Sequence, residues 1–309
     1  MEKSEKRFRS NGKLMLSGEY LVLHGARSLA VPTLLGQSLR IREIDHTGSL
    51  FWKTKVVFNP WMDCEIDPDS WQVIHADKPE KVQHLVRLLK VASEIRGDRE
   101  WLKGKEVVSE IEFDIEWGLG SSSSLISNIA WWAGIDPFLL SRSISDGSGY
   151  DIACARSDQP LLYRTGDTEP GYILIDFLPP FHERLAFVYL GRKQDSASSV
   201  RNFLNKALVT EKDVSNISAI TEKFCRTMQL DEFESLMGEH ENIMSHILGV
   251  PPVKQGLFHD FPGSVKSLGA WGGDFVMITM HQEWPEVETY FSAKGMETII
   301  SYNKMVKAF

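Results

Sequence analysis

The chain has 309 residues, 42% hydrophobic and 25% charged, so it can bury a substantial core, and its length suggests two domains. Its 34 Lys and Arg against 42 Asp and Glu give a net charge of −8, which argues against general affinity for nucleic acid or anionic membranes. Its apolar stretches are too short to span a bilayer and residues 1–10 lack the apolar core of a secretory signal, so we expect a cytoplasmic protein.

In the first half, residues 14–23 and 38–44 are predicted to be β-rich. Residues 78–95 place apolar side chains at near-helical spacing between Pro79 and Gly97, which predicts a helix. Residues 107–117 alternate strictly between polar and apolar side chains, which predicts a strand that runs into Gly118. The apolar residues 125–133 then predict a second helix.

A polar, glycine-bearing stretch at residues 164–171, followed by prolines, predicts a domain boundary. We therefore expect an N-terminal domain over residues 1–168 and a C-terminal domain over residues 169–309, with one large domain as the alternative. The second half predicts strands at residues 185–190 and 275–280. It also predicts helices after Ser198 and over residues 214–228 and 231–248, and together these elements form a mixed α+β pattern.

The sequence GLGSSSS at residues 118–124 lies between the predicted strand and the second predicted helix. Glycines allow backbone N–H groups to turn toward a phosphate, and the start of a helix adds the positive end of its dipole. Serine hydroxyls can donate to phosphate oxygens or bind Mg²⁺. We therefore predict a phosphate-binding loop made of Gly118, Gly120, Ser121, Ser122 and Ser123. A flexible linker or an ordinary serine helix cap is the alternative.

Other nucleotide and metal patterns are not matched. In the GxxxxGK[ST] pattern, Arg7 occupies the position of the first glycine before Gly12 and Lys13, and Ser123 occupies the last glycine of GxGxxG. The HRD and DFG tripeptides of protein kinases do not occur. Met244 stands where an HExxH zinc site that begins at His240 would need its second histidine, so we assign no transition metal.

Five ordered segments resemble the GHMP kinase superfamily, which is named for galactokinase, homoserine kinase, mevalonate kinase and phosphomevalonate kinase. They are GKLMLSGEYLVLHG (12–25), GLGSSSS (118–124), GSGYDIA (147–153), EHENIMSHILGVPP (239–252) and GAWGGD (269–274). The third and fourth are similar to the branch of mevalonate and phosphomevalonate kinases. The resemblance implies an α+β fold of two domains with the site between them. The N-terminal domain would be like domain 2 of ribosomal protein S5, with a left-handed β-α-β unit, and the C-terminal domain would be ferredoxin-like.

The resemblance also implies an enzyme that transfers the γ-phosphate of ATP, with Mg²⁺, to a small-molecule acceptor such as mevalonate or phosphomevalonate. Several alternatives stay open: a kinase of a sugar or another alcohol, a diphosphomevalonate decarboxylase, or an inactive relative that acts as a binding protein. The expected partners are ATP and the acceptor, with no nucleic acid and no membrane, and a homodimer is possible.

Phosphoryl transfer needs positioning, charge stabilisation and a group that orients the acceptor. The resemblance assigns the base to Asp151 and places Lys13 against it, where Lys13 would lower the pKa of Asp151. The alternative is that Asp151 caps a helix and Lys13 is exposed. The resemblance assigns Mg²⁺ to the hydroxyl of Ser122, while Glu19 is either a second ligand or a buried structural glutamate. Leu140 stands where mevalonate kinases carry glutamate, which favours the phosphomevalonate branch.

The acceptor side is assigned by the same resemblance to Lys13, Tyr20, His24, Ser148, Lys193, Gly272, Gly273 and Asp274. Trp271 replaces a glycine of the third motif and would narrow the acceptor pocket, stack on a ligand or only change the packing. Residues 191–201 offer Arg192, Lys193 and Arg201 to an anionic acceptor, or form a solvated loop with a serine cap.

Overall fold

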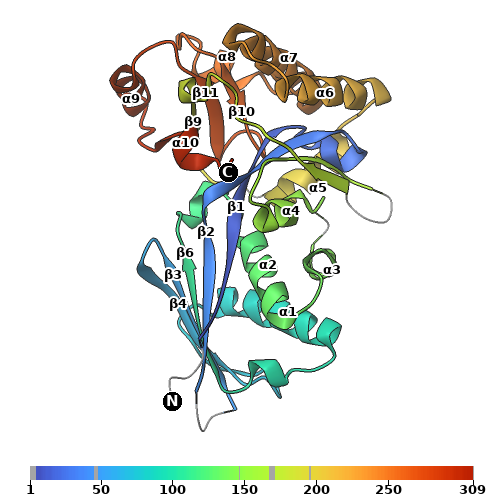
Figure 1. Ribbon diagram of the computed structural model, residues 1–309, viewed down its shortest axis with the longest axis vertical. Coiled ribbons are helices and arrows are strands. Elements are labelled where there is room, and N and C mark those ends of the chain that lie inside the picture. The colour runs from blue at the N-terminus through green and yellow to red at the C-terminus, as the bar shows by residue number, and fades with distance from the viewer. Residues whose placement is uncertain (1–4, 45–47, 146, 167–170, 195, 309) are drawn as a thin grey trace. The chain divides into compact units, whose positions relative to one another are not determined.

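The computed structural model describes residues 5–44, 48–145, 147–166, 171–194 and 196–308. It forms two compact units. Unit 1 contains Met1–Gly12, Leu35–Ile115 and Leu119–Arg156, and unit 2 contains Lys13–Leu34, Glu116–Gly118 and Ser157–Phe309. The long strands β1 (Lys6–Ser17) and β2 (Ser28–Glu43) contribute to both units (Figure 1). The predicted boundary between residues 168 and 169 lies outside the described residues.

Unit 1 is built on a sheet with the strand order β5-β4-β3-β6-β2. Strands β3 (Leu50–Val56), β4 (Asn59–Ile66) and β5 (Val73–Ala76) form an antiparallel meander. Strand β6 (Lys105–Ile111) is parallel to β3 and antiparallel to β2. Helix α1 (Pro79–Arg96) belongs to the crossover between the parallel strands β3 and β6, so unit 1 contains a β-α-β arrangement.

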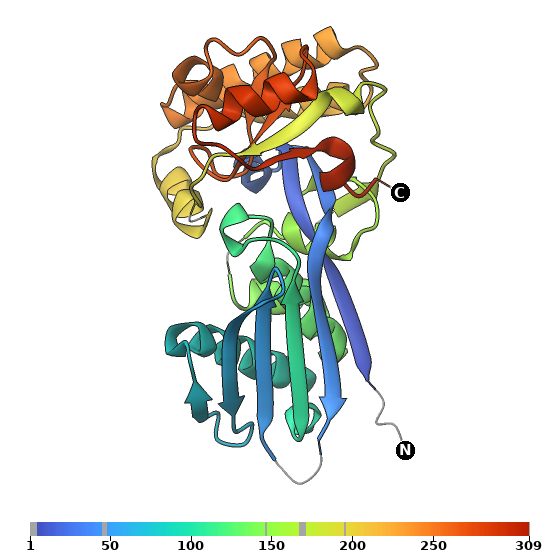
Figure 2. The same cartoon turned by 90° about the vertical axis from the view of Figure 1, so that its left-hand side faces the viewer.

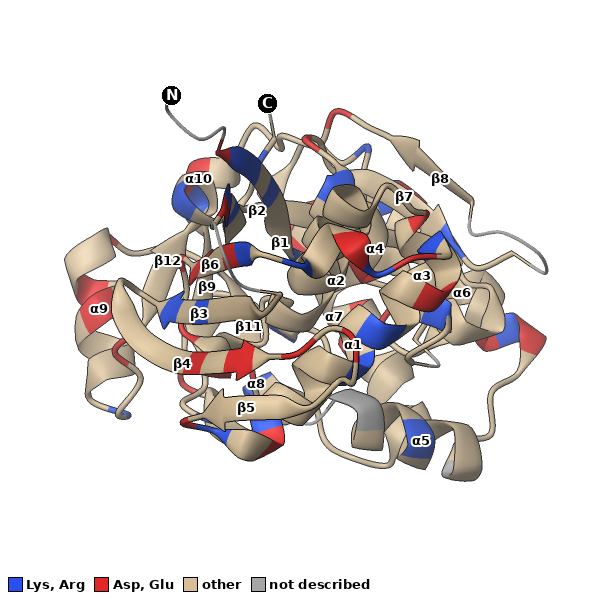
Figure 3. Cartoon of the chain, turned by 90° about the horizontal axis from the view of Figure 1, so that it is seen from below, with Lys and Arg blue, Asp and Glu red and all other residues tan. Residues whose placement is uncertain are grey.

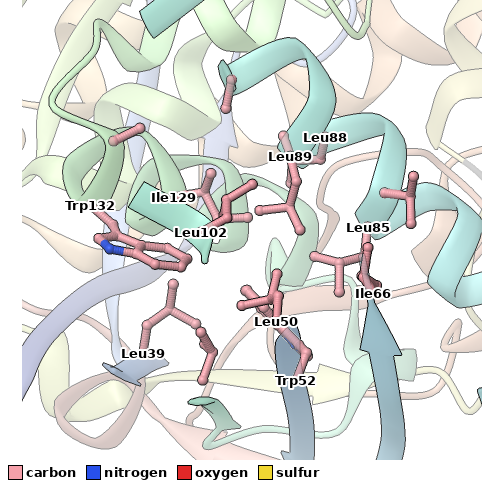
Figure 4. Close-up of a cluster of buried hydrophobic side chains, with 14 of the residues drawn as sticks. Leu39, Leu50, Trp52, Ile66, Leu85, Leu88, Leu89, Leu102, Ile129 and Trp132 are labelled. Carbon is pink, nitrogen blue, oxygen red and sulfur yellow. The ribbon is translucent and has the colours of Figure 1, made fainter. Parts of the chain in front are cut away.

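The core of unit 1 lies between this sheet and its helices, which Figure 2 shows behind the strands. Figure 4 shows leucines of α1 directed at Leu50, Trp52 and Ile66 of the strands. Helices α2 (Ser121–Ala133) and α3 (Pro137–Arg142) add Ile129, Trp132 and the fully buried Leu140. Helix α4 (Tyr150–Arg156) packs against α2. This packing holds the first turns of α2 and α4 on a rigid core.

The other face of the sheet carries charged side chains. Figure 3 shows positive residues on β3 and negative residues on β4. Arg40 and Arg42 of β2 lie 2.8 Å from Glu110 and 2.5 Å from Glu106 of the neighbouring β6. Exposed ion pairs of this kind contribute little stability, so this face is mainly a solvated surface.

The hairpin between β3 and β4 has an unusual turn made of Val57 and Phe58, with φ of 47° and 67°. The left-handed region costs an L-residue about 1–2 kcal/mol, and such turns normally use Asn-Gly. Val57 and Phe58 are 42% and 88% exposed, so burial offsets little of this cost. We expect the double change Val57→Asn, Phe58→Gly to raise the free energy of unfolding by about 1 kcal/mol in a urea titration. An unchanged or lower value would contradict strain in this turn.

Unit 2 contains a second sheet with the order β10-β11-β9-β12, in which all neighbours are antiparallel. Its chain order is β9 (Leu185–Tyr189), helices α6 (Glu211–Phe224) and α7 (Leu230–Leu248), β10 (Val265–Ser267), β11 (Phe275–Thr279), α9 (Trp284–Ser292) and β12 (Ile299–Ser301). This order is the split βαβ pattern of a ferredoxin-like domain, as predicted. The remaining elements are β7 (Leu161–Arg164), β8 (Gly171–Leu174), α5 (Ser196–Lys206), α8 (Val253–Leu257) and α10 (Tyr302–Met305).

The predicted helices at residues 78–95, 214–228 and 231–248 and the strands at residues 185–190 and 275–280 are confirmed within a few residues. The predicted strand at residues 107–117 is too long, because its pairing with β2 ends at Ile111 and residues 115–117 form a 3₁₀ turn. In residues 14–23, β1 ends at Ser17 and a 3₁₀ turn follows at Leu21–His24, because Gly18 turns the chain at a φ of 93°. Among the described residues, no helix is both long and apolar enough to cross a bilayer.

Candidate functional site

Helix α2 starts directly after a glycine. Gly120 precedes the helix at a φ of 89° and has no side chain with which to cap the first turn. The first N–H groups of an α-helix have no partner inside the helix, so they can bind an anion together with the helix dipole. The predicted phosphate-binding role of Gly120 and the following serines therefore has a structural basis in this helix start.

The four serines belong to this first turn, because α2 begins at Ser121 and not at residue 125 as predicted. The Ser123 hydroxyl donates to the Gly120 carbonyl at 2.9 Å, and the Ser124 hydroxyl donates to Gln37 Oε1 at 2.7 Å. Both serines are buried, whereas Ser122 is exposed. Ser123 is thus left with its backbone N–H for a phosphate, and Ser122 offers a hydroxyl to a phosphate or a cation.

Asp151 lies in the first turn of α4, the helix packed against α2. It is half-buried, and its Oδ1 accepts the N–H of Ile152 at 3.0 Å. Ser148 is half-buried in the segment just before α4. The pairing of Asp151 with Lys13 stays a prediction.

Unit 2 brings together Lys13, Gly118 and Asp274 from three separate motifs. Lys13 Nζ donates to the Gly118 carbonyl at 2.9 Å, so the ammonium group has a defined position. A Cβ on Gly118 would lie 2.6 Å from the carboxyl carbon of Asp274, so the Asp274 carboxylate would have to move to admit any other residue, and the φ of 67° also favours glycine. The first glycine of the predicted phosphate loop is therefore favoured by its contact with the third motif.

Asp274 is held by the segment that follows β9. Its backbone N–H donates to the Arg192 carbonyl at 2.8 Å, and its Oδ1 accepts the Gln194 N–H at 3.0 Å. Burial raises the pKa of Asp274, and the Gln194 N–H, Lys13 and Lys193 oppose the rise. A Cβ on Gly273 would lie 2.7 Å from the Arg192 carbonyl, which explains the glycine there.

We expect Gly118→Ala to lower the free energy of unfolding by about 2–4 kcal/mol, because it adds a clash with Asp274 to the strain of a φ of 67°. Gly249→Ala is the matched control, since Gly249 has a φ of 68° but open space around its Cβ position. It should lose only about 1 kcal/mol in the same chemical denaturation experiment. Equal losses in the two variants would show that Asp274 does not restrict Gly118.

Aromatic side chains gather around the turn that follows β1. The Tyr20 ring lies 4.8 Å from the Phe203 ring of α5, and the His24 ring lies 5.7 Å from it. Burial raises the pKa of Tyr20, and hydrogen bonds to its hydroxyl from Ser199 and from the Trp271 backbone oppose the rise. Ser199 lies in the segment 191–201 that was predicted for an anionic acceptor, whereas Phe203 was not predicted as a site residue, because only the packing of α5 on this turn identifies it.

Trp271 is half-buried, and its indole N–H has no hydrogen-bond partner among the described residues. An unsatisfied buried donor costs about 1–3 kcal/mol, so a ligand acceptor at this position would be stabilised. Lys193, another predicted acceptor residue, lies 3.8 Å from the carboxylate of Glu116. Gly272, beside Trp271, adopts a φ of 98°, which also favours glycine.

Glu19 lies at the centre of a buried group of ionisable side chains in unit 2. Its Oε1 is 2.5 Å from Lys266 Nζ and its Oε2 is 3.0 Å from His240 Nε2, and the three side chains are at most 1% exposed. Burial alone would raise the pKa of Glu19, but Lys266 and His240 lower it to about 2. Burial and Lys266 lower the pKa of His240, and Glu19 opposes them. The neighbouring Glu241 has a pKa raised to about 7, mainly by burial.

These contacts bear on the expected Mg²⁺ ligands. Glu19 is fully buried and its Oε1 accepts from Lys266, which supports the buried structural alternative, while its Oε2 has no hydrogen-bond partner among the described residues. Leu140 is fully buried in unit 1 and offers no ligand. Among the described residues, no three His, Cys, Asp or Glu side chains cluster as a metal site. Mg²⁺ usually keeps several waters and binds substrate phosphates, so the exposed Ser122 fits it as a single protein ligand.

No protein-family model matches the sequence, and no curated protein is similar to it in sequence. Solved structures are similar to it in fold. The mevalonate kinase of Methanococcus jannaschii has a TM-score of 0.70 and 15% sequence identity, over 97% of this chain and 98% of that one. The phosphomevalonate kinase of Streptococcus pneumoniae, in complex with phosphomevalonate and AMPPNP, has a TM-score of 0.69 and 15% identity, over 96% of this chain and 99% of that one.

The galactokinase of Lactococcus lactis, complexed with galactose, has a TM-score of 0.64 and 11% identity, over 99% of this chain and 94% of that one. These structural neighbours all have the two-domain GHMP kinase fold. The predicted fold class is thereby confirmed. Because the identities are low, the likeness is one of fold, and activity has to be argued from the residues of this chain.

Proposed function

We propose that the chain is an ATP-dependent phosphotransferase acting on a small molecule. The observation that carries this proposal is the first turn of α2 behind the glycine N-cap Gly120, with the exposed Ser122 on it and α4, which carries Asp151, packed against α2. A helix start of this kind favours a polyphosphate. The similarity of fold to kinases that span the same length supports the proposal.

In this mechanism ATP supplies the γ-phosphoryl group, and bound Mg²⁺ would offset charge on its phosphates. The backbone N–H groups of Gly120 to Ser123 bind phosphate oxygens, and the Ser122 hydroxyl would hold the cation. Asp151 orients the acceptor oxygen and takes its proton. Lys13, held by the Gly118 carbonyl, stabilises negative charge that develops during transfer.

For the acceptor we propose mevalonate or phosphomevalonate, bound in contact with Tyr20, His24 and Trp271. The aromatic rings would pack against the apolar carbons of such an acceptor, and Lys193 would attract its anionic group. Ser148, Gly272, Gly273 and Asp274 complete the proposed acceptor set. A sugar or another alcohol and the decarboxylation of diphosphomevalonate remain the competing reactions.

The test is to incubate the purified chain with Mg-ATP and separate acceptors: mevalonate, phosphomevalonate, diphosphomevalonate, galactose and homoserine. Mass spectrometry of the products and ADP release should identify one phosphorylated acceptor, and release of carbon dioxide would identify a decarboxylase instead. If no acceptor reacts, calorimetry with Mg-ATP decides the matter. Absence of binding would contradict the proposal and favour an inactive relative.

Trp271→Gly restores the glycine of the related motif and removes the indole from the acceptor side. We expect the KM of the acceptor to change by about tenfold, while the KM of ATP stays within about twofold, because the phosphate-binding turn of α2 is not altered. The control is Trp131→Ala, which removes an exposed indole that is not part of the proposed acceptor set. Equal changes in both KM values would contradict a role in acceptor choice.

Cytoplasmic location, a homodimer and the absence of nucleic-acid and membrane partners stay predictions. Gel filtration of the purified chain with light scattering would test the homodimer directly.

A further inference from the structure

The segment 239–252, which resembles part of the kinase family, has no role in the phosphate transfer described above. It forms the last part of α7 and the residues that follow it. Two neighbouring side chains of this segment, His240 and Glu241, are only 0% and 3% exposed. Burying two ionisable groups is costly unless each has partners, so their contacts indicate what the segment does.

His240 contacts the turn after β1. Its Nε2 lies 3.2 Å from the Gly18 backbone nitrogen and 3.0 Å from Glu19 Oε2. Gly18 and Glu19 directly precede Tyr20, which adopts a φ of 59°. A bulky residue in this region of backbone space persists only where its surroundings hold it. His240 and Glu19 provide such surroundings at the buried end of the turn.

Glu241 contacts the strand that leads into the third motif. Its Oε1 accepts the Ser267 N–H at 2.9 Å and its Oε2 accepts the Val253 N–H at 3.2 Å. Ser267 is the last residue of β10, and the loop 269–274 begins two residues later. Glu241 therefore fixes the point from which that loop departs.

Lys266 joins the turn that contains Glu19 to the end of β10. Its Nζ donates to Glu19 Oε1 at 2.5 Å and to the Ser267 carbonyl at 2.9 Å, inside a fully buried environment. At their other ends, the Trp271 backbone lies near enough to the Tyr20 hydroxyl to oppose the rise of its pKa. Lys266 is thus the direct link between the two segments, and Tyr20 and Trp271 are neighbours.

We propose that Glu19, His240, Glu241 and Lys266, here called the buried ionic cluster, are positioning residues that hold the turn 18–25 and the loop 269–274 in one arrangement for acceptor binding. The assignment to acceptor binding depends on the proposed function, whereas the positioning itself does not. Because these four residues are buried and belong to, or contact, the segments that carry Tyr20 and Trp271, they act through those segments and not on the acceptor itself.

The test compares Glu241→Gln with Glu239→Gln, the same change at an exposed position on the same helix. Glutamine has one acceptor oxygen in place of two, so either Ser267 or Val253 loses its partner. Hydrogen exchange measured by mass spectrometry needs no substrate. In Glu241→Gln we expect exchange at least tenfold faster in peptides covering residues 18–25 and 264–274, with peptides of α2 and β6 unchanged, and no change in Glu239→Gln.

If the chain is an active kinase, Glu241→Gln should raise the acceptor KM about tenfold and leave the ATP KM within about twofold. Unchanged exchange in residues 18–25 and 264–274, or faster exchange spread over both units, would overturn the positioning proposal. Local exchange changes with equal effects on both KM values would overturn the link to the acceptor. Lack of any phosphotransfer by the unmodified chain would contradict the proposed function alone. Should Glu241→Gln fail to fold, Lys266→Arg is subjected to the same exchange criteria.

Discussion

Asp151→Asn should reduce kcat by about 10²–10⁴-fold while Mg-ATP binding, measured by calorimetry, stays within about twofold. Asparagine keeps the shape of the side chain but cannot take a proton from the acceptor hydroxyl. Asparagine also keeps an oxygen that can accept the N–H of Ile152, as Asp151 Oδ1 does at 3.0 Å. The loss should therefore appear in turnover and not in the amount of folded protein.

A helix-capping role for Asp151 would predict a different result. Asp136 caps α3 by accepting the N–H of Phe138 at 2.9 Å, so Asp136→Asn is the control for the loss of a carboxylate at a helix start. We expect Asp136→Asn to keep full turnover and to change stability by no more than about 1 kcal/mol. Full turnover in Asp151→Asn would remove Asp151 from the role of base.

Local patterns explain why much of the fold could be predicted. Helix α1 has apolar residues on one face, Pro79 at its start and Gly97 at its end with a φ of 90°, and each of these signals acts within one or two turns. The alternation of polar and apolar residues predicted strand β6. It did not predict where the strand ends, because the end depends on where β2 stops pairing with it. The start of α2 was placed too late, because the serines, which commonly cap helices, here follow a glycine cap.

The candidate site could be predicted only where a motif is contiguous. Gly118 was identified as a phosphate-loop glycine, but its contact with Asp274 depends on the folded chain. The sequence did not decide whether Glu19 is a Mg²⁺ ligand or a structural glutamate, because its partner Lys266 is 247 residues away and lies in no motif. Phe203 was missed for the same reason, since nothing in α5 indicates which turn it packs against.

Lys266→Met should lower the free energy of unfolding at pH 7 by about 3–5 kcal/mol, because it leaves the Glu19 carboxylate buried without its cation. Lys304→Met, at an exposed position, is the control and should change stability by about 0.5 kcal/mol or less. Adding Glu19→Gln to Lys266→Met removes the uncompensated charge and should recover most of the loss. Urea titrations of the four proteins measure these differences.

The pH dependence of the same variants provides a stricter test of the ion pair. With Lys266 present, the pKa of Glu19 is lowered from 4.5 to about 2, so this carboxylate stabilises the fold fully above pH 4.5, and the contribution is lost as the pH falls toward 2. Without Lys266, burial raises the pKa of Glu19 above 4.5, and the carboxyl then destabilises the fold as the pH rises. The pKa of Glu241, which Lys266 also lowers, should rise further and add an effect of the same sign. The stability lost in Lys266→Met should therefore grow steadily from pH 3 to pH 7, and a loss independent of pH would mean that Lys266 stabilises the fold by packing and not by its charge.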